Sequence, residues 1–325
     1  TDDVRVILIK LADRLHNLRT MEVMAREKQL KVASETLFLY SPLANRLGLY
    51  AIKTELEELS FKYSQPYIYK DISEKMVASD EARQQIFSNF KPPIENELEK
   101  LKLNFEIRCR MKTAYSIWQK MQTDQVPFEE IYNTFSVEII LDSKLESEKL
   151  DCWAAYSVVT GLYTPNNKKL RDWISTPKAN GYEAIHATVM GHDGHWVDVQ
   201  IRSKRMDEIA MKGYAAHWKY KDQEKLDAGL DKWLKRTREL LKESEEDTID
   251  FINDFKKNLF EDEIVVFTPK GDMINMPAGA TVLDFAYAIH TELGNHCIGA
   301  NVNHRLVPID YQLKSGDQVQ IIDSK

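Results

Sequence analysis

Cysteine, glycine and proline are all scarce in this sequence of 325 residues. It has three cysteines (Cys109, Cys152 and Cys297), 12 glycines and 10 prolines. An odd number of widely separated cysteines excludes a disulfide-stapled scaffold and a zinc site of paired cysteines, and we expect a reducing, cytoplasmic location. So little glycine and proline excludes a collagen-like or disordered chain.

Excess positive charge and long apolar runs are also missing. Lysine and arginine total 44 against 51 aspartates and glutamates, which gives a formal net charge of −7. A polyanionic ligand must therefore meet a local cluster of cations rather than a uniformly basic surface. The longest apolar stretch, residues 153–163, has about half the length that a helix needs to cross a bilayer, so we expect no membrane partner. The first residue is threonine, and we expect the sequence to belong to a longer protein.

The chain is too long for one hydrophobic core, and its pattern changes along its length. Residues 1–100 place apolar side chains at helical spacing, with a predicted break at Pro92-Pro93. After residue 105, strand-like and helical segments follow one another, and a highly charged stretch comes later. We predict an all-α segment (1–100), an α/β domain with a mixed sheet (101–221), a helical linker (222–262) and a small β-rich domain (263–325).

The α/β part has the clearest strand pattern. Strands are predicted at 105–110, 131–141, 184–190 and 196–202, and helices at 113–121 and 153–163. In the strand 196–202, valine and isoleucine alternate with Trp196, Asp198, Gln200 and Arg202. One face of this strand is therefore predicted to be core and the other a polar working surface.

The first candidate site lies in the segment Lys10–Arg19. On a helix, Asp13, His16 and Asn17 share one face because they are three and four residues apart. A carboxylate and an imidazole in this arrangement can hold a divalent metal ion. The alternative is a solvated polar face beside a core, which is commoner for residues of these types.

The second candidate site lies where a basic strand precedes a helix. Arg108, Arg110 and Lys112 end the predicted strand, and the predicted helix begins at Thr113. Cations and free backbone N–H groups converge at such a helix N-terminus, so phosphate can bind there and an arginine plane can stack on a base. The alternative is an ordinary basic strand end.

The third candidate site is the basic segment 168–186. Cations there alternate with aromatic rings and a turn, which suits a nucleotide because rings stack on the base and cations neutralise phosphates. The residues concerned are Lys168, Lys169, Arg171, Lys178, Asn180, Tyr182 and His186. The alternative is a solvated loop.

The fourth candidate is Asp198, which lies beside Gln200 and Arg202 on the polar face of its strand. A carboxylate among basic loops can bind Mg²⁺ or accept a proton from a hydroxyl. The alternative is a surface ion pair with Arg202. The phosphate-binding fingerprints of P-loop and Rossmann proteins are absent from the sequence.

Several segments resemble the long RelA/SpoT family, whose members make and degrade the alarmone (p)ppGpp. Lys10-Leu-Ala-Asp-Arg-Leu-His-Asn resembles the last motif of the family's hydrolase domain. Segments similar to the synthetase domain are Tyr115-Ser-Ile-Trp-Gln-Lys-Met, Pro177-Lys-Ala-Asn-Gly-Tyr, Val199-Gln-Ile-Arg and Ala215-Ala-His-Trp-Lys-Tyr. Val266-Phe-Thr-Pro-Lys-Gly-Asp and Leu283-Asp-Phe-Ala-Tyr-Ala-Ile-His resemble the TGS domain. The resemblance implies a nucleotidyltransferase-like synthetase domain followed by a small β-grasp TGS domain.

The resemblance implies pyrophosphate transfer from ATP to the 3′-hydroxyl of GDP or GTP, with Mg²⁺ offsetting phosphate charge. It implies that Arg110 contacts the adenine of ATP and that Lys112 contacts its phosphates. It also implies that Lys169 and Arg171 lie on the donor-phosphate side. It implies that Lys178, Asn180 and His186 are polar contacts to substrate and that Tyr182 stacks on guanine. Asp198 stands where the family has a Glu that activates the 3′-hydroxyl; with Gln200 beside it, it is the catalytic candidate and a candidate Mg²⁺ ligand.

The chain departs from the family's pattern at these acidic positions. The family motif Tyr-Asp-x-x-Ala-x-Arg, in which Asp is a Mg²⁺ ligand, corresponds here to Tyr132-Asn133-Thr-Phe-Ser-Val-Glu138. Asn133 keeps an oxygen atom that can bind a metal ion, but it loses the negative charge that a hard cation favours. Glu138 reverses the charge of the family's Arg, and on a regular strand it would point away from Asn133. We therefore expect a weakened or inactive synthetase.

For the hydrolase, the resemblance implies that Asp13 is a Mn²⁺ ligand in a longer parent protein and that Asn17 contacts nucleotide. The other ligands would precede residue 1, so we expect that this chain does not hydrolyse (p)ppGpp by itself.

Two alternative functions follow from the same resemblance. One is a catalytically degenerate domain that binds guanine nucleotide and regulates the hydrolase. The other is a module that binds uncharged tRNA and the ribosome through its TGS domain, with His290 and His296 as candidate contacts.

Overall fold

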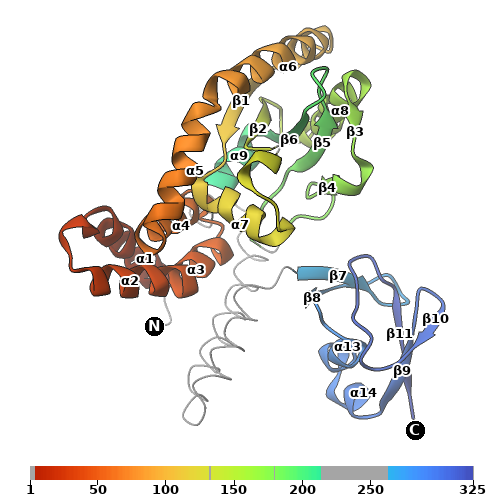
Figure 1. Cartoon of the computed structure of the whole chain (residues 1–325). Helices are drawn as coiled ribbons and strands as arrows, with labels where there is room; N and C mark the ends of the chain where they lie inside the picture. The colour runs from red at the N-terminus through yellow and green to blue at the C-terminus, as the bar shows by residue number, and fades with distance from the viewer. Residues whose placement is uncertain (1–3, 132, 179, 214–262, 325) are drawn as a thin grey trace. The chain divides into compact units, whose positions relative to one another are not determined.

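The structure is a computed structural model that describes residues 4–131, 133–178, 180–213 and 263–324. The chain divides into two compact units, Thr1–Lys232 and Trp233–Lys325 (Figure 1). The first unit holds both the predicted all-α segment and the predicted mixed sheet. The predicted linker falls outside the described residues. Within the described part of the chain, no helix has the length and apolar character needed to cross a membrane.

The first unit begins with helices whose apolar sides form a core of their own (Figure 1). Leu11, Leu18, Leu47 and Leu56 lie in this core and are buried. The helices are α1 (Val4–Arg19), α2 (Arg26–Glu35), α3 (Ser41–Arg46), α4 (Tyr50–Ser64) and α5 (Pro66–Ala78), with short helical turns at Met21–Val23 and Thr36–Tyr40.

The predicted break at Pro92-Pro93 is wrong, because one helix, α6 (Asp80–Lys100), runs through both prolines. A proline in a helix interior removes a backbone N–H and crowds the preceding turn, at a cost of about 3 kcal/mol. Phe90, Ile94 and Leu98 of α6 are buried in the main core of the unit. Burying three such side chains stabilises the helix enough to offset that cost.

The centre of the first unit is a six-stranded mixed sheet, as predicted. Its order is β1-β2-β6-β5-β3 with β4 paired to β5, and β2 and β6 are parallel while the other pairs are antiparallel. The strands are β1 (Phe105–Met111), β2 (Phe135–Leu141), β3 (Thr164–Pro165), β4 (Arg171–Asp172), β5 (Ile185–Met190) and β6 (Trp196–Ser203). The helices are α7 (Ala114–Asp124), α8 (Glu148–Leu162) and α9 (Lys204–Lys212), with short turns at Phe128–Glu130 and Asn167–Lys169.

Alternation along the strands separates an apolar face of the sheet from a polar one. Val137 of β2 and Val199 of β6 are buried in the main core, to which α6 and α8 also contribute. On the other face, Ser136 is paired with Asp198, and Glu138 with Gln200. The predicted polar face of 196–202 is confirmed, although Arg202 on that face is only 1% exposed.

The second unit is a small domain of antiparallel strands packed on a helix, as predicted. Its core contains Val266, Phe285, Val302 and Val319. Strand β7 (Glu263–Phe267) pairs with β8 (Met273–Pro277), and β9 (Cys297–Val302) lies between β10 (Arg305–Val307) and β11 (Val319–Asp323). The helices are α13 (Val282–Ile289) and α14 (Thr291–Asn295).

The turn between α3 and α4 packs against two segments of the α/β part. Asn180 Nδ2 donates hydrogen bonds to Asn45 O at 3.1 Å and to Tyr50 Oη at 2.7 Å. Gly48 has a φ of +68°, and a Cβ there would lie 3.1 Å from Asn180 O. Gly213, which ends α9, lies against the backbone of Leu47 and Gly48. The all-α segment is therefore anchored to the α/β part by close backbone contact.

We predict opposite stability effects for two glycine-to-alanine changes. Gly213→Ala should lower the free energy of unfolding by more than about 1 kcal/mol, because Gly213 has a φ of +53° and a Cβ would overlap the backbone of Leu47 and Gly48. Gly161→Ala should raise it by about 0.5–1 kcal/mol, because Gly161 is helical and nothing lies within 4 Å of its Cβ position. Urea unfolding measures both changes; equal effects would show that the contact at Gly213 does not matter.

Candidate functional site

Asp198 lies on the polar face of the sheet and is held by three neighbours. Its Oδ2 accepts a hydrogen bond from Lys112 Nζ at 2.8 Å. Its Oδ1 accepts from Asn133 Nδ2 at 2.7 Å and from Thr188 Oγ1 at 2.8 Å. Burial raises the pKa of the Asp198 carboxyl, but the Lys112 ammonium and these hydrogen bonds outweigh burial and hold that pKa below its ordinary value. The carboxylate is therefore charged, and both of its oxygens accept hydrogen bonds.

Asn133 turns the nitrogen of its amide, not the oxygen, toward Asp198. The amide Oδ1 faces Lys120 Nζ of α7 at 3.4 Å. The reverse orientation would set the amide oxygen against a carboxylate and the amide hydrogens against an ammonium, so the neighbours fix the orientation. The residue predicted to occupy a metal position thus presents a donor. We refer to Asp198, Asn133, Lys112, Lys120 and Thr188 as the Asp198 cluster.

The Asp198 cluster does not fit Mg²⁺. That ion favours an octahedral shell of oxygen ligands, but the two oxygens of Asp198 already accept from an ammonium, an amide and a hydroxyl. Within the part of the chain that the structure describes, no group of three or more His, Cys, Asp or Glu side chains could hold a metal ion.

Positive charge is concentrated beside the cluster. Burial, then the Lys112 ammonium, lowers the pKa of Lys120, and Lys169 lowers it further. Each ammonium has three N–H groups, of which Lys112 uses one on Asp198 and Lys120 one on Asn133. The cluster can therefore offer further donors to an anion.

Glu138 joins two arginines of the polar face. Its Oε1 accepts from Arg202 Nη2 at 2.7 Å and from Arg110 Nη1 at 3.2 Å. Arg202 also donates to Asp207 Oδ1 at 2.8 Å and to Gln200 Oε1 at 3.2 Å. The alternative of an Asp198–Arg202 surface pair is therefore wrong. Buried Arg202 needs these partners, because an unpaired buried charge costs several kcal/mol.

The expectation that Glu138 points away from Asn133 is also wrong. Asn133 precedes β2, which begins at Phe135, so strand alternation does not relate the two residues. Both side chains contact residues of the polar face, Asn133 through Asp198 and Glu138 through Arg202.

The predicted phosphate position at the N-terminus of α7 is filled by the chain itself. Glu58 of α4 accepts hydrogen bonds from the backbone nitrogens of Ala114 at 3.3 Å and Tyr115 at 3.0 Å. Thr113 Oγ1 accepts from the backbone nitrogen of Ser116. These are orphan donors of the first helical turn. A carboxylate, favoured there by the helix dipole, holds the place that a phosphate was predicted to take.

Tyr182 is buried rather than open for stacking on a base. Tyr182 is 9% exposed, and its ring contacts the ring of Tyr50 edge-on, with the two centroids 5.3 Å apart. Its hydroxyl lies 2.6 Å from His186 Nε2. Burial, then Arg202, lowers the pKa of His186 to about 4. The imidazole is therefore neutral near pH 7, and its Nε2 accepts the hydrogen bond of the tyrosine.

The other predicted cations of this segment lie at its edge. Arg171 begins β4 and is paired with His186, and its Nη1 donates to the backbone oxygens of Lys168 and Leu170. Lys169 ends the turn before β4. Lys178 lies over the ring of Trp173, 4.7 Å from its centroid. Arg171 thus lies beside β5 at the edge of the sheet, and Lys178 packs on an aromatic ring.

The predicted hydrolase and tRNA contacts lie elsewhere. On α1, Asn17 Nδ2 donates to Asp13 Oδ2 at 3.4 Å, which confirms that these two residues share a helix face. In the second unit, His290 Nδ1 accepts from the backbone nitrogen of Glu292, and His296 Nδ1 lies 2.9 Å from Glu292 O. The two exposed imidazoles flank α14.

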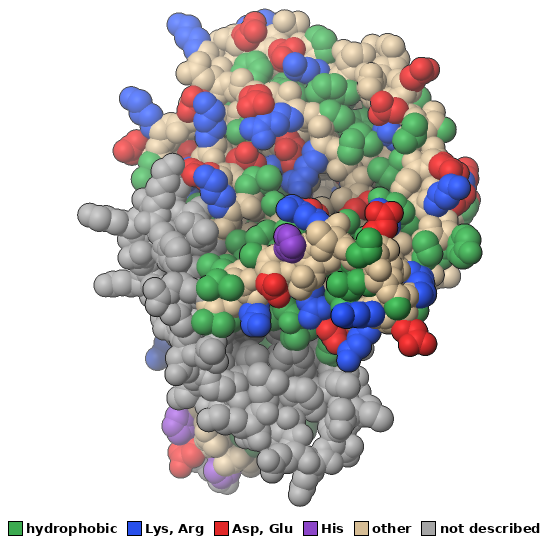
Figure 2. All heavy atoms as spheres, turned by 90° about the vertical axis from the view of Figure 1, so that its left-hand side faces the viewer, with side chains coloured by type: hydrophobic (Ala, Val, Ile, Leu, Met, Phe, Trp, Pro, Cys, Tyr) green, Lys and Arg blue, Asp and Glu red, His purple; other side chains and the backbone are tan. Residues whose placement is uncertain are grey.

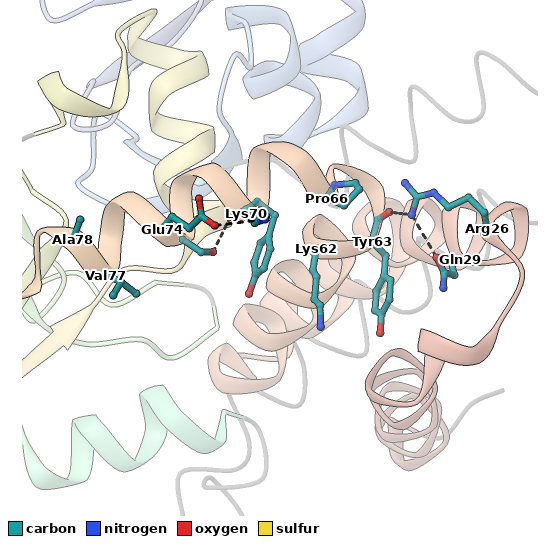
Figure 3. A pocket seen from close by; sticks show the side chains of 11 residues that line it. Arg26, Gln29, Lys62, Tyr63, Pro66, Lys70, Glu74, Val77 and Ala78 are labelled. Atoms are coloured by element: carbon teal, nitrogen blue, oxygen red, sulfur yellow. Dashed lines mark hydrogen bonds and ion pairs between the residues drawn. The ribbon is translucent and has the colours of Figure 1, made fainter.

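One groove lies away from the predicted site. It has a volume of about 750 Å³ and lies along α4 and α5, with Arg26 and Gln29 of α2 at one end (Figure 3). Tyr63, Pro66 and Val77 give it apolar walls, and it contains none of the predicted site residues. Positive and negative side chains are interspersed on the face that Figure 2 shows.

Four residues of the site were not predicted. Lys120 lies within the segment Tyr115–Met121, so its motif could have indicated it. Thr188 required the pairing of β5 with β6, which places it opposite Asp198. Tyr50 and Glu58 lie on a helix far away in the sequence, and no local pattern marks them as neighbours of the site.

Three family matches cover most of the chain. Residues 109–225 match the region found in RelA / SpoT proteins, residues 264–323 match the TGS domain, and residues 1–50 match the HD domain. A guanosine-3′,5′-bis(diphosphate) 3′-pyrophosphohydrolase of Aquifex aeolicus is 41% identical over 323 residues, 99% of this chain and 46% of that protein. A GTP pyrophosphokinase of Myxococcus xanthus is 40% identical over 325 residues, 99% of this chain and 42% of that protein.

The small alarmone synthetase 1 from Bacillus subtilis is among the solved structures that the chain is similar to. It is 18% identical, with a TM-score of 0.30, over 51% of this chain and 100% of that one. The same enzyme bound to its product pppGpp is 19% identical, with a TM-score of 0.30, over 50% of this chain and 96% of that one.

The matches define a class of proteins that contain HD, RelA / SpoT and TGS regions. The chain belongs to the RelA/SpoT family, with segments of its HD, synthetase and TGS domains. It spans less than half the length of these two relatives. Synthetases of this family bind ATP and GDP or GTP, and its HD and synthetase domains imply dependence on divalent metal ions.

We predict that the His186 ring titrates with a pKa of about 4, because it is buried near Arg202, Lys178 and Arg171, with Asp198 opposing them. Unfolded histidine titrates near 6.5. The unfolded chain therefore binds an extra proton between about pH 6.5 and 4, and stability should fall through this window as the pH falls, by at most about 3 kcal/mol.

Nuclear magnetic resonance of the imidazole measures this pKa directly. Tyr182→Phe should raise it, because the lost hydroxyl no longer donates to the neutral ring. His186→Gln should remove this part of the pH dependence of unfolding. A ring pKa near 6.5 in the unaltered chain would contradict the burial of His186.

Proposed function

We propose that the chain is part of a protein of (p)ppGpp metabolism whose synthetase domain binds guanine nucleotide but transfers pyrophosphate weakly or not at all. The family reaction moves pyrophosphate from ATP to the 3′-hydroxyl of GDP or GTP, with Mg²⁺ as cofactor. The family matches support the substrate class. We also propose domain limits of 1–100, 101–221, 222–262 and 263–325.

The observation that carries the weak transfer is the contact between Asn133 and Asp198. Transfer between phosphates needs cations that offset the charge developing on the transferred group. The Asn133 amide donates to Asp198 at 2.7 Å, where a metal-binding pair would need two oxygen ligands facing the ion. The site can therefore hold an anion but offers little to a bridging Mg²⁺.

The donor side supports the same proposal. Arg110, the candidate for adenine, is engaged by Glu138, and the amides at the start of α7 are engaged by Glu58. ATP would have to displace both carboxylates. Each displacement lowers affinity for ATP, because charge-assisted hydrogen bonds are worth about 1.5–3 kcal/mol.

The acceptor side requires a rearrangement for stacking. The candidate ring, Tyr182, is covered by Tyr50 and bonded to His186. We propose that guanine nucleotide binds against the polar face, where the cations around Arg171 and Lys178 and those of the Asp198 cluster face its phosphates. Stacking on Tyr182 would follow only when its contact with Tyr50 opens.

We predict little or no (p)ppGpp synthesis when the chain is incubated with ATP, Mg²⁺ and GDP or GTP and the nucleotides are separated. Asn133→Asp combined with Asp198→Glu should raise transfer at least about tenfold, because two facing carboxylates favour a divalent ion. The added change Glu138→Gln should raise it further by freeing Arg110.

Asn104→Asp provides the control, since it adds the same charge on an exposed side chain just before β1, at the opposite end of that strand from Lys112. It should leave transfer unchanged. Robust transfer by the unaltered chain would contradict the proposal.

We further propose that a longer parent protein hydrolyses (p)ppGpp with Mn²⁺ and that Asp13 is one ligand. Asp13→Ala in that parent should lower hydrolysis more than about 100-fold. Removing a residue that only hydrogen-bonds to a metal ligand lowers activity by about 10–100-fold, and removing the ligand itself should have a larger effect. Asp71→Ala removes an exposed carboxylate on α5 and is the control. Full activity of the Asp13→Ala protein would show that Asp13 is not a ligand.

The alternative of tRNA and ribosome binding through the second unit stays a prediction. His290 and His296 are exposed on the same short helical segment, as a binding role requires. Both rings also make hydrogen bonds to the backbone of Glu292, so a structural role explains their positions equally well.

A further inference from the structure

The positive charge that a metal ion brings to a phosphate is already built into the Asp198 cluster. The cluster contains two ammonium groups, Lys112 and Lys120, and one carboxylate, Asp198, so its formal charge is +2 − 1 = +1. With Asp at position 133 the same cluster would carry +2 − 2 = 0. Asn133 therefore leaves the cluster with a net positive charge, which a phosphate can meet without a metal ion.

The geometry also disfavours the entry of a divalent ion. Lys112 Nζ lies 2.8 Å from Asp198 Oδ2, and the Asn133 amide lies 2.7 Å from Oδ1. A metal binding to Oδ1 must displace one of its two donors, and a metal binding to Oδ2 must lie next to the Lys112 ammonium, which repels it. A phosphate meets the opposite situation, because the N–H groups that the two lysines do not use within the cluster can point at its oxygens.

We propose that the Asp198 cluster binds the phosphate chain of its nucleotide as the metal-free anion, with the ammonium groups of Lys112 and Lys120 where a bridging divalent cation would otherwise lie. The inference rests on the proposed function, because it assumes that the synthetase domain binds guanine nucleotide. It adds that nucleotide binding does not require Mg²⁺, because Mg²⁺ competes with the two ammonium groups for the phosphates.

The test is calorimetry of GDP and of ppGpp binding to the whole chain, once with EDTA and once with excess Mg²⁺. The unaltered chain should bind at least as tightly in EDTA as in Mg²⁺. Asn133→Asp places two carboxylates in contact, so its affinity in EDTA should fall about tenfold or more, which corresponds to about 1.4 kcal/mol. Added Mg²⁺ should restore the affinity of this variant.

Two further variants keep the test decisive. Lys120→Gln removes one ammonium without adding a carboxylate, and it should weaken binding in EDTA about tenfold, the value of one charge-assisted hydrogen bond. Asn104→Asp should bind like the unaltered chain under both conditions. Circular dichroism checks that each variant is folded.

The failures can be told apart. Binding by the unaltered chain that needs Mg²⁺, or an Asn133→Asp chain that binds normally in EDTA, would overturn the metal-free site alone. The absence of any binding, with or without Mg²⁺, would overturn the proposed nucleotide binding itself and this inference with it.

Discussion

The parallel pairing of β2 with β6 is the constraint on which the polar face depends. It sets Ser136 opposite Asp198 and Glu138 opposite Gln200, although these residues are more than 60 positions apart in the sequence. The antiparallel partner β5 then adds Thr188 and His186 to the same rows. Because side chains alternate across a strand, a slip by one residue would send Asp198 into the core. The hydrophobic face, with Val137 and Val199 buried, therefore fixes the register that the polar site needs.

The departures from the family pattern are consistent with one another. Asn133 donates to Asp198, and Lys112 completes the shell of that carboxylate. Glu138 accepts a hydrogen bond from Arg202, which is 1% exposed. Without Glu138, the buried charge of Arg202 would have fewer partners. Buried polar groups in folded proteins are hydrogen-bonded. Here the altered residues satisfy each other, so they stabilise the polar face.

Local pattern predicted the elements well and their contacts poorly. The strands at 105–110 and 196–202 and the helix at 113–121 follow from alternation and amphipathic spacing, and the structure confirms them. The break at Pro92-Pro93 fails because burial of the same helix overrides local propensity. Pairs such as Glu58 with the start of α7 depend on tertiary packing between segments 56 residues apart or more. Sequence periodicity contains no information about such pairs.

Helix α4 connects the two halves of the site. Glu58, in its third turn, occupies the amides at the start of α7, and Tyr50, at its first residue, covers Tyr182 and accepts from Asn180. The donor-side amides and the guanine-side loop are thus held by one rigid element. A displacement of α4 along its axis would change both contacts together. The same helix packs in the core that contains Leu11 and Leu18 of α1, so the helix carrying Asp13 is packed against the element that contacts both sides of the site.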